Sequence, residues 1–361
     1  MKIVIFCGGY GTRMWPASRK SFPKQFYPLV GGKSFFQITY ERFRKAFAAP
    51  DIFISTERIY EHFIKKQEKE IPKANIIVEP ERKDNMAAIG LVTALLNKKF
   101  PNEVMFISWS DHLIHQEDEF LRKVKLAGEY ALETGQIVSI DEKPKYPSVH
   151  HGWVKVGHAH DNYHGVEILP IVQHFEKPDT LSAKKFFQSA SYLINTGYRA
   201  WRTDTMLTFY QKYAPEMYAG LLEIINHTGN KNFETFLYRE YHRFEKESVE
   251  NGIFEKLPEG VRVTIPSDVG WEDSGTWQLF YRALRINGVE NVLEGGALLE
   301  HLDSDGNLVI APRGKMVGLI GIRNSVVIDT PDGLLVCSME ETDKVKELFK
   351  LLEEHYPEFV K

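Results

Sequence analysis

Short apolar segments alternate with longer segments of helical periodicity along the first 140 residues. Apolar runs typical of buried strands lie at 3–7, 51–55, 75–78, 104–109 and 136–140. Between them, apolar residues spaced by three and four predict helices at 35–47, 57–70, 86–98 and 117–133. This alternation is typical of βαβ units, so the pattern predicts an α/β fold, a Rossmann-like and mostly parallel sheet with helices on both faces.

The next part of the chain, 141–285, predicts a continuation of the same sheet with insertions. Strands are expected at 152–157, 166–176 and 261–265, and helices at 181–189, 203–213 and 232–240. Near residue 286 the helices give way to short β-like pieces, followed by a final helix at 343–354. We therefore expect two domains, 1–285 and 286–361. The second is a small all-β appendage ending in a helix, and a short left-handed β-helix is one form it could take.

Composition narrows the classes of partner. The chain of 361 residues has a formal net charge of −4 and no block of Lys and Arg, so a nucleic-acid partner is not expected. The two cysteines, Cys7 and Cys337, lie far apart, which argues against a disulfide framework or a zinc site. No signal peptide is recognisable, and no apolar run approaches the ~20 residues that a membrane helix needs. We expect a cytoplasmic protein without a membrane partner.

A glycine-rich turn follows the first predicted strand. Gly8, Gly9 and Gly11 stand where an open α/β sheet binds its ligands, at the carboxyl end of a strand. Met14 excludes the dinucleotide pattern GxGxxG, and the Walker pattern also fails. What remains is a turn whose backbone amides can face an anion, with Arg13 close behind. A tight turn with a surface arginine is the alternative interpretation.

The residues that follow the turn carry a family resemblance. GGYGTRMWPASR, followed by FPKQF, resembles the opening of the mannose-1-phosphate guanylyltransferases, a family of sugar nucleotidylyltransferases. The resemblance implies that Gly8, Gly9, Gly11 and Thr12 bind the nucleotide. It also implies that Arg13 and Lys24 neutralise phosphate charge, which phosphoryl-type transfer requires. The α/β domain would then be the catalytic domain.

Two further segments resemble the magnesium-binding motifs of this family. SWSDHLI (108–114) supplies Asp111 as a metal ligand and Ser110 as a nucleotide contact, and DVGWEDSGTW (268–277) supplies Asp273. A hard divalent ion takes carboxylate oxygens, and Mg²⁺ needs only one or two of them beside phosphates and water. Glu272 is an additional carboxylate next to Asp273, which could bind the metal or face solvent, and we expect it to face solvent. Read without the resemblance, the first segment is an Asx turn or helix cap and the second a Gly/Ser turn.

The sugar side of the family's site has counterparts here. HFEKPD (174–179) supplies Glu176 for sugar or ribose hydroxyls and Lys177 for the sugar phosphate. YLINTGYRAW (192–201) supplies Asn195, whose amide can both donate and accept hydrogen bonds. Gly152 would let the sugar approach the backbone. A charged surface turn is the alternative for the HFEKPD segment.

The chain departs from the family pattern in two segments. EPERKDNMAAI (79–89) carries Lys83 where the family has arginine, with Asn85 as a nucleotide contact. In the second segment, ESVENGIFEK (247–256), Glu250 stands where the family has an aspartate. Its side chain is one methylene longer, which could shift a contact to the sugar. A separate feature is a histidine cluster, which can bind transition metals but which we interpret as a surface hairpin; it comprises His150, His151, His158, His160 and His164.

The resemblance implies a reaction of GTP with mannose 1-phosphate that gives GDP-mannose and pyrophosphate, with Mg²⁺ as cofactor. The sugar phosphate would attack the α-phosphorus in line, and no general base is needed. A homodimer is a further expectation. Two alternatives stay open: the same chemistry with another sugar or base, and a sensor subunit that binds nucleotide sugars without turnover.

Overall fold

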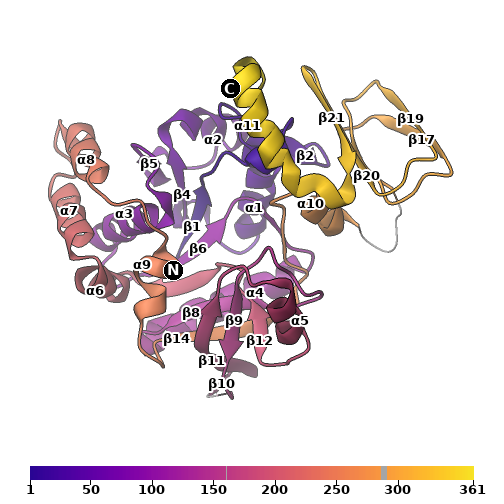
Figure 1. Cartoon of the computed structure of the whole chain (residues 1–361). Helices are drawn as coiled ribbons and strands as arrows, with labels where there is room; N and C mark the ends of the chain where they lie inside the picture. Colours follow the sequence, from indigo (N-terminus) through magenta and orange to yellow (C-terminus); the bar gives the residue numbers. More distant parts are fainter. Residues whose placement is uncertain (160, 286–290) are drawn as a thin grey trace.

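A computed structural model describes residues 1–159, 161–285 and 291–361. Its centre is an eleven-stranded sheet in the order β10-β11-β9-β12-β8-β13-β6-β1-β4-β5, with β14 paired to β11 and β8 (Figure 1). The strands are β1 (Lys2–Cys7), β4 (Ile52–Glu57), β5 (Ile76–Glu79), β6 (Val104–Trp109), β8 (Ile137–Glu142), β9 (Trp153–Val156), β10 (Asp161–Tyr163), β11 (Val166–Phe175), β12 (Tyr192–Ile194), β13 (Arg199–Arg202) and β14 (Arg262–Ser267).

The amino-terminal half of this sheet is parallel, as the βαβ pattern predicts. β1 pairs in parallel with β4 and β6, and β4 pairs in parallel with β5. β13 runs antiparallel between β6 and β8, so the two parallel parts of the sheet are separated by one reversed strand. Because β1 and β6 are parallel neighbours, their carboxyl ends lie side by side. This brings the glycine turn next to the segment that follows β6.

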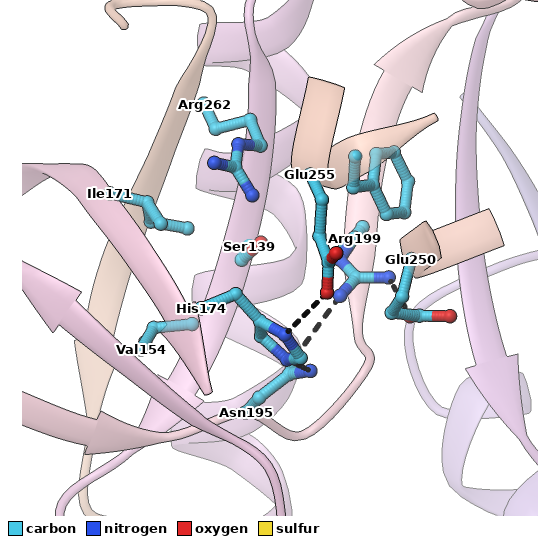
Figure 2. Close-up of a pocket in the computed structure, with 10 residues that line it drawn as sticks. Ser139, Val154, Ile171, His174, Asn195, Arg199, Glu250, Glu255 and Arg262 are labelled. Atoms are coloured by element: carbon cyan, nitrogen blue, oxygen red, sulfur yellow. Dashed lines mark hydrogen bonds and ion pairs between the residues drawn. The ribbon is translucent and has the colours of Figure 1, made fainter. Parts of the chain in front are cut away.

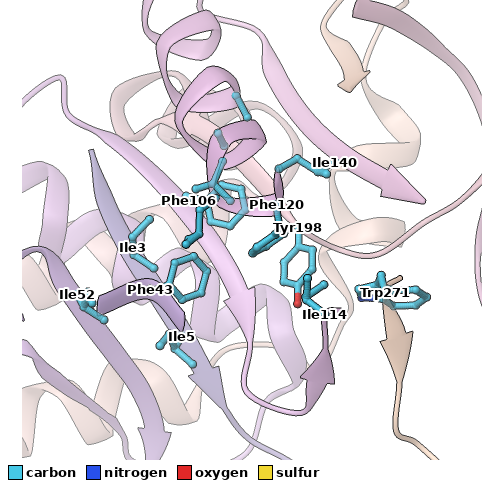
Figure 3. Close-up of a cluster of buried hydrophobic side chains, with 14 of the residues drawn as sticks. Ile3, Ile5, Phe43, Ile52, Phe106, Ile114, Phe120, Ile140, Tyr198 and Trp271 are labelled. Atoms are coloured by element: carbon cyan, nitrogen blue, oxygen red, sulfur yellow. The ribbon is translucent and has the colours of Figure 1, made fainter. Parts of the chain in front are cut away.

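Helices cover both faces of the sheet, which confirms the predicted α/β class. β1 divides its side chains between two cores: Ile3 and Ile5 lie in the first (Figure 3), and Val4 and Phe6 lie in the second, on the other face. The first core includes side chains of α1 (Phe35–Arg44), α2 (Glu61–Gln67) and α4 (Glu117–Thr134); α5 (Thr180–Phe187) adds Phe186 at its margin. The second includes side chains of α3 (Asp84–Lys99), α6 (Thr203–Tyr213), α7 (Pro215–Asn226), α8 (Phe233–His242) and α9 (Val249–Gly252).

Some elements differ from the sequence prediction. The helix expected at 57–70 is shorter, because residues Arg58–Tyr60 form a 3-10 turn before α2 begins. The pattern gave no indication of α7 or of the short strands β12 and β13. α7 begins at Pro215 directly after α6, and its mixed composition hides the boundary between the two helices. Within the described chain, no helix combines the length and the apolarity needed to cross a membrane.

The carboxy-terminal part stacks short strands in parallel. β16 (Val292–Glu294), β18 (Leu308–Ile310) and β20 (Ser325–Thr330) form one ladder, which β21 (Gly333–Ser338) closes in antiparallel pairing. β17 (Leu298–Leu302) and β19 (Met316–Ile320) form a second parallel pair. Successive coils of chain thus return to the same register, as in a β-helix, and the predicted all-β appendage is confirmed. The predicted boundary at 286 lies outside the described residues.

This β-rich part packs against the segment that follows the glycine turn. One buried cluster contains Met14 and Trp15 together with Leu308, Val326 and side chains of α10 (Trp277–Leu284) and α11 (Val345–His355). The Trp15 indole N–H donates to the carbonyl of Phe359 at 3.0 Å. Arg19 donates to the same carbonyl and to Asp332 Oδ1, the latter at 2.6 Å. The carboxy-terminal residues therefore hold the chain between the glycine turn and Lys24.

Replacing Arg19 with methionine is expected to lower the free energy of unfolding by about 1–3 kcal/mol, because two acceptors lose a charged donor that is only 11% exposed. Urea unfolding measures this loss. Lys20→Met is the matched control: its ion pair with Glu353 is exposed, so the change should stay below about 1 kcal/mol. Equal losses in the two variants would contradict a special role for Arg19.

Candidate functional site

The glycine turn has a backbone that requires glycine. Gly9 has φ +90° and Gly11 has φ +66°, in the left-handed region. A Cβ on Gly11 would lie 2.8 Å from Lys24 Cγ, so the turn also needs glycine to let Lys24 pass. The Gln25 side-chain amide donates to the carbonyl of Gly9 at 3.2 Å, and this hydrogen bond stabilises the turn. Gly8 is exposed, with open space on its Cβ side.

Lys24 lies at the centre of the predicted phosphate site. Its side chain is 9% exposed, and its ammonium contacts Asp111 Oδ2 at 2.8 Å. The same ammonium donates to the carbonyl of Ser274 at 3.0 Å. Burial raises the pKa of Asp111, but the charge and hydrogen bond of Lys24, together with His112, more than offset it and leave the pKa below its usual range. Asp111 is therefore ionised at neutral pH.

A short strand pair brings the second predicted metal ligand to the same place. β7 (His112–Leu113) pairs with β15 (Glu272–Asp273), and Asp273 stands opposite His112. A Cβ on Gly275 would lie 3.3 Å from both carboxylate oxygens of Asp273 and 3.5 Å from an Arg13 nitrogen. Arg13, Lys24, Asp111 and Asp273, predicted from separate segments, thus meet at the end of β1 and β6.

This donor set fits a magnesium ion. Asp111 and Asp273 offer hard carboxylate oxygens, one of which, Asp111 Oδ2, already contacts the Lys24 ammonium. Among the described residues, no group of three or more His, Cys, Asp or Glu could hold a metal. An ion held by two carboxylates would complete its shell with phosphate oxygens and water, which is how Mg²⁺ commonly binds.

Two predicted nucleotide contacts, Ser110 and Thr12, are less exposed than Gly8. Ser110 is buried, and its backbone N–H donates to the carbonyl of Phe6 at 3.2 Å. Thr12 begins the 3-10 helix Thr12–Met14 and is half-buried. Cys7, at the end of β1, is fully buried. The roles of Ser110 and Thr12 toward a nucleotide stay predictions.

The predicted sugar residues converge at a second place. A Cβ on Gly152 would lie 3.1 Å from Glu176 Oε2, 3.1 Å from His174 Nε2 and 3.4 Å from Asn195 Nδ2. Polar atoms from two segments therefore point at the one position that glycine leaves open. Asn195 also donates its backbone N–H to the carbonyl of Gly152 at 2.9 Å. Lys177, with φ +41°, is exposed and pairs with Glu176 Oε1 at 3.0 Å.

A chain of aromatic contacts connects the two places. Trp271 donates its indole N–H to His112 Nδ1 at 3.0 Å and packs edge-on against His151, which precedes Gly152. His151 is 6% exposed, and burial lowers its pKa to about 4, so the ring is neutral at neutral pH.

The surface-hairpin interpretation is therefore wrong for His151. It holds for His158 and His164, which are exposed beside the β10–β11 hairpin, and His150 is half-buried. His160 lies outside the described residues. The position of His151 beside Trp271 was hidden because 120 residues separate the two along the chain.

Glu272 also differs from its prediction. Its side chain is half-buried beside Tyr146, whose hydroxyl donates to Glu272 Oε2 at 3.4 Å. Burial raises the pKa of Glu272 to about 7, although Lys145 and Arg282 oppose the shift. Glu272 stands opposite Leu113 in the β7–β15 pair.

The segment 79–89 arranges its polar residues differently from the sequence expectation. The Lys83 ammonium donates to the carbonyl of His242 at 2.7 Å. Both functional atoms of Asn85 are engaged with α9, since Oδ1 accepts from the Val249 N–H at 2.8 Å and Nδ2 donates to Glu250 at 3.2 Å. Arg82 instead lies over the Tyr10 ring, with its guanidinium 4.5 Å from the ring centroid.

Sequence reasoning missed three residues near these places, Arg82, His174 and Arg199. Arg199 lies in the otherwise apolar run YRAW at the start of β13, and it is buried. A charged residue inside a buried strand is the signal that could have indicated it, because such a charge needs a specific partner.

The chain matches two family models. One, described as "Nucleotidyl transferase", covers residues 2–287, and one described as "MannoseP isomerase/GMP-like beta-helix domain" covers residues 301–352. A "Mannose-1-phosphate guanylyltransferase" of Escherichia coli is 27% identical over 355 residues, which is 97% of this chain and 75% of the relative. "Mannose-1-phosphate guanylyltransferase RfbM" of Salmonella typhimurium is 28% identical, over 97% of this chain and 72% of the relative.

A solved structure shares the fold. The crystal structure of a "mannose-1-phosphate geranyltransferase" from Thermus thermophilus superposes with a TM-score of 0.87 and 24% identity, covering 98% of this chain and 99% of that chain. At this identity the likeness establishes the fold only. The nucleotidyl transferase model, however, spans most of the sequence, including the glycine turn and both aspartate segments. The protein therefore belongs to the nucleotidyl transferase family and is an enzyme of that class.

Proposed function

We propose that the enzyme transfers GMP from GTP to mannose 1-phosphate, giving GDP-mannose and pyrophosphate. One observation carries this proposal: Arg13, Lys24, Asp111 and Asp273 meet beside the glycine turn, while Glu176 and Asn195 converge on Gly152. The first place suits a triphosphate and its metal, and the second suits a sugar. The names of the curated relatives from Escherichia coli and Salmonella typhimurium support guanine and mannose as the substrates.

In this reaction a phosphate oxygen of the sugar attacks the α-phosphorus in line, and the bond to pyrophosphate breaks. The attacking phosphate is already an anion, so positioning and charge neutralisation do the catalytic work. Arg13 and Lys24 neutralise phosphate oxygens, and Lys177 steadies the sugar phosphate. Asp111 and Asp273 would hold Mg²⁺, which supplies further positive charge when bound. Asn85, Ser110 and Thr12 remain proposed nucleotide contacts, and the homodimer and cytoplasmic location stay predictions.

The base has less structural support than the reaction. Lys83 and Asn85 already hydrogen-bond protein partners with their side chains, so only their remaining N–H hydrogens are left for a base. This observation keeps another nucleotide open as a second candidate. It also directs attention to Arg82, whose terminal nitrogen lies 3.6 Å from the position of a Cβ on Gly9.

Replacing Arg82 with glutamine is expected to raise KM for GTP about five- to tenfold, because a guanidinium beside the glycine turn can pair with the nucleotide. Initial rates at varied GTP measure the effect. Lys83→Gln is the adjacent control, and its KM should stay within about twofold because Lys83 bonds to a carbonyl of the protein. A larger effect at Lys83 than at Arg82 would reverse this assignment.

The sugar is tested with GTP held constant and mannose, glucose and galactose 1-phosphates supplied in turn. Mass spectrometry of the products identifies the nucleotide sugar formed. The proposal predicts GDP-mannose as the main product. If GDP-glucose or GDP-galactose forms at a higher kcat/KM, the assignment of mannose as the substrate is wrong, but the proposed nucleotidyl transfer still holds. Binding of nucleotide sugars without any product would support the sensor alternative.

A further inference from the structure

Arg199, at the start of β13, lies beside His174, Asn195 and Glu250 (Figure 2). Its side chain is 7% exposed and forms an ion pair with Glu250, with Nη1 to Oε1 at 2.9 Å. The other arm of the guanidinium, Nη2, donates to Asn195 Oδ1 at 3.3 Å. The guanidinium also lies near the Phe254 ring, 4.3 Å from its centroid. One buried cation is thus held in a fixed orientation between Glu250 and Asn195.

These bonds determine which way the Asn195 amide points. Oδ1 accepts from the Gly197 N–H at 3.1 Å as well as from Arg199, so both of its lone pairs are used. The amide nitrogen then faces His174 Nε2 at 3.0 Å. Since burial lowers the pKa of His174, the ring is neutral at neutral pH, and Nε2 can accept one of the two amide hydrogens. One amide hydrogen remains free for a ligand.

The Glu176 carboxylate lies beside this free amide hydrogen of Asn195 and helps to select its ligand. Asn195 Nδ2 and Glu176 Oε2 both lie within 3.4 Å of the position that a Cβ on Gly152 would take. A hydroxyl placed between them can accept from the amide and donate to the carboxylate, which matches the two functions of one hydroxyl group. A hydroxyl of the other configuration at that carbon would leave both polar groups unpaired.

We propose that Arg199, anchored by Glu250, is a positioning residue that fixes Asn195 as a hydrogen-bond donor to one sugar hydroxyl. This inference rests on the proposed function, because it assigns the sugar to the position beside Gly152. Glu250 also accepts from Asn85 at 3.2 Å, so the replacement of the family's aspartate by glutamate gives Arg199 its anchor and ties it to the 79–89 segment. The amide is accordingly a donor only, which narrows the sequence expectation that it could also accept.

The test uses Arg199→Lys, which keeps the charge beside Glu250 but cannot hold two acceptors in a planar fork. We expect KM for mannose 1-phosphate to rise about tenfold, KM for GTP to stay within about twofold, and discrimination against glucose and galactose 1-phosphates to weaken. Arg202→Lys is the control from the same strand, because its half-exposed side chain pairs with Asp204, outside the cluster around Asn195. An unchanged KM for mannose 1-phosphate, or equal rises for both substrates, would overturn the inference.

Asn195→Asp provides a second variant, in which Oδ1 remains for Arg199 but the donor is lost. It should raise KM for mannose 1-phosphate at least as much as Arg199→Lys does. In the double variant, the fold-increase in this KM should be smaller than the product of the two single fold-increases. Full multiplicativity would contradict coupling between the residues.

Calorimetric titration with the three sugar 1-phosphates separates this inference from the proposed function. A wild-type enzyme that binds mannose 1-phosphate but does not turn over would refute the function. Weaker binding by Arg199→Lys would still support the positioning role, and unchanged binding would overturn it. Absence of binding of all three by the wild-type enzyme would overturn the inference as well.

Discussion

Replacing Asp273 with asparagine is expected to lower kcat by about a thousandfold or more, because a charged ligand of the proposed metal becomes a neutral amide. The fold should remain, since β15 is held by backbone pairing with β7 and α10 is capped by the Thr276 hydroxyl. Initial rates of pyrophosphate release measure the loss, and thermal unfolding checks that the protein is intact.

Asp268→Asn is the control for this change, because Asp268 lies in the same segment but is exposed and 3.7 Å from Lys145. Its kcat should stay within about twofold of the wild-type value. A normal rate for Asp273→Asn would remove Asp273 from the mechanism. An equal loss in both variants would indicate that the segment, and not the carboxylate, matters.

Replacing Lys24 with methionine is expected to lower kcat/KM for GTP by about a hundredfold or more. The variant removes the charge that would neutralise phosphate oxygens. It also removes the buried partner of Asp111, so burial is opposed much less strongly and the pKa of Asp111 rises. Activity of the variant should therefore fall further as the pH is lowered, where Asp111 becomes protonated, and a pH–rate profile measures this.

Lys20→Met serves again as the control, since Lys20 pairs with Glu353 at the surface. Its kcat/KM should match that of the wild-type enzyme. If Lys24→Met reacted at the wild-type rate, the interpretation of the glycine turn and Lys24 as a phosphate site would be wrong.

Much of the fold could be predicted from local pattern. The strands at the ends of the βαβ units are short and continuously apolar, as in β1 and β6, and the helices between them have clear periodicity. Where the pattern failed, elements were short or merged. β13 has only the residues Arg199–Arg202 and begins with a charge, and only Ala214 separates α7 from α6.

The candidate site could be predicted residue by residue but not as a geometry. The motifs supplied Lys24, Asp111 and Asp273, yet their meeting depends on the pairing of β7 with β15, two strands of two residues each. Such strands carry no detectable periodicity. Arg199 was missed for a similar reason, because its contacts with Glu250 and Asn195 join segments far apart in the sequence. The burial of His151 beside Trp271 was hidden in the same way.

The central claim is that the enzyme joins GMP to mannose 1-phosphate. The most direct measurement is pyrophosphate release with Mg²⁺, mannose 1-phosphate and each of GTP, ATP, UTP, CTP and dTTP in turn. We expect release with GTP well above the other four, and little release when mannose 1-phosphate is omitted. Faster release with another triphosphate would contradict the guanylyl assignment, and no release with any of them would contradict the claim as a whole.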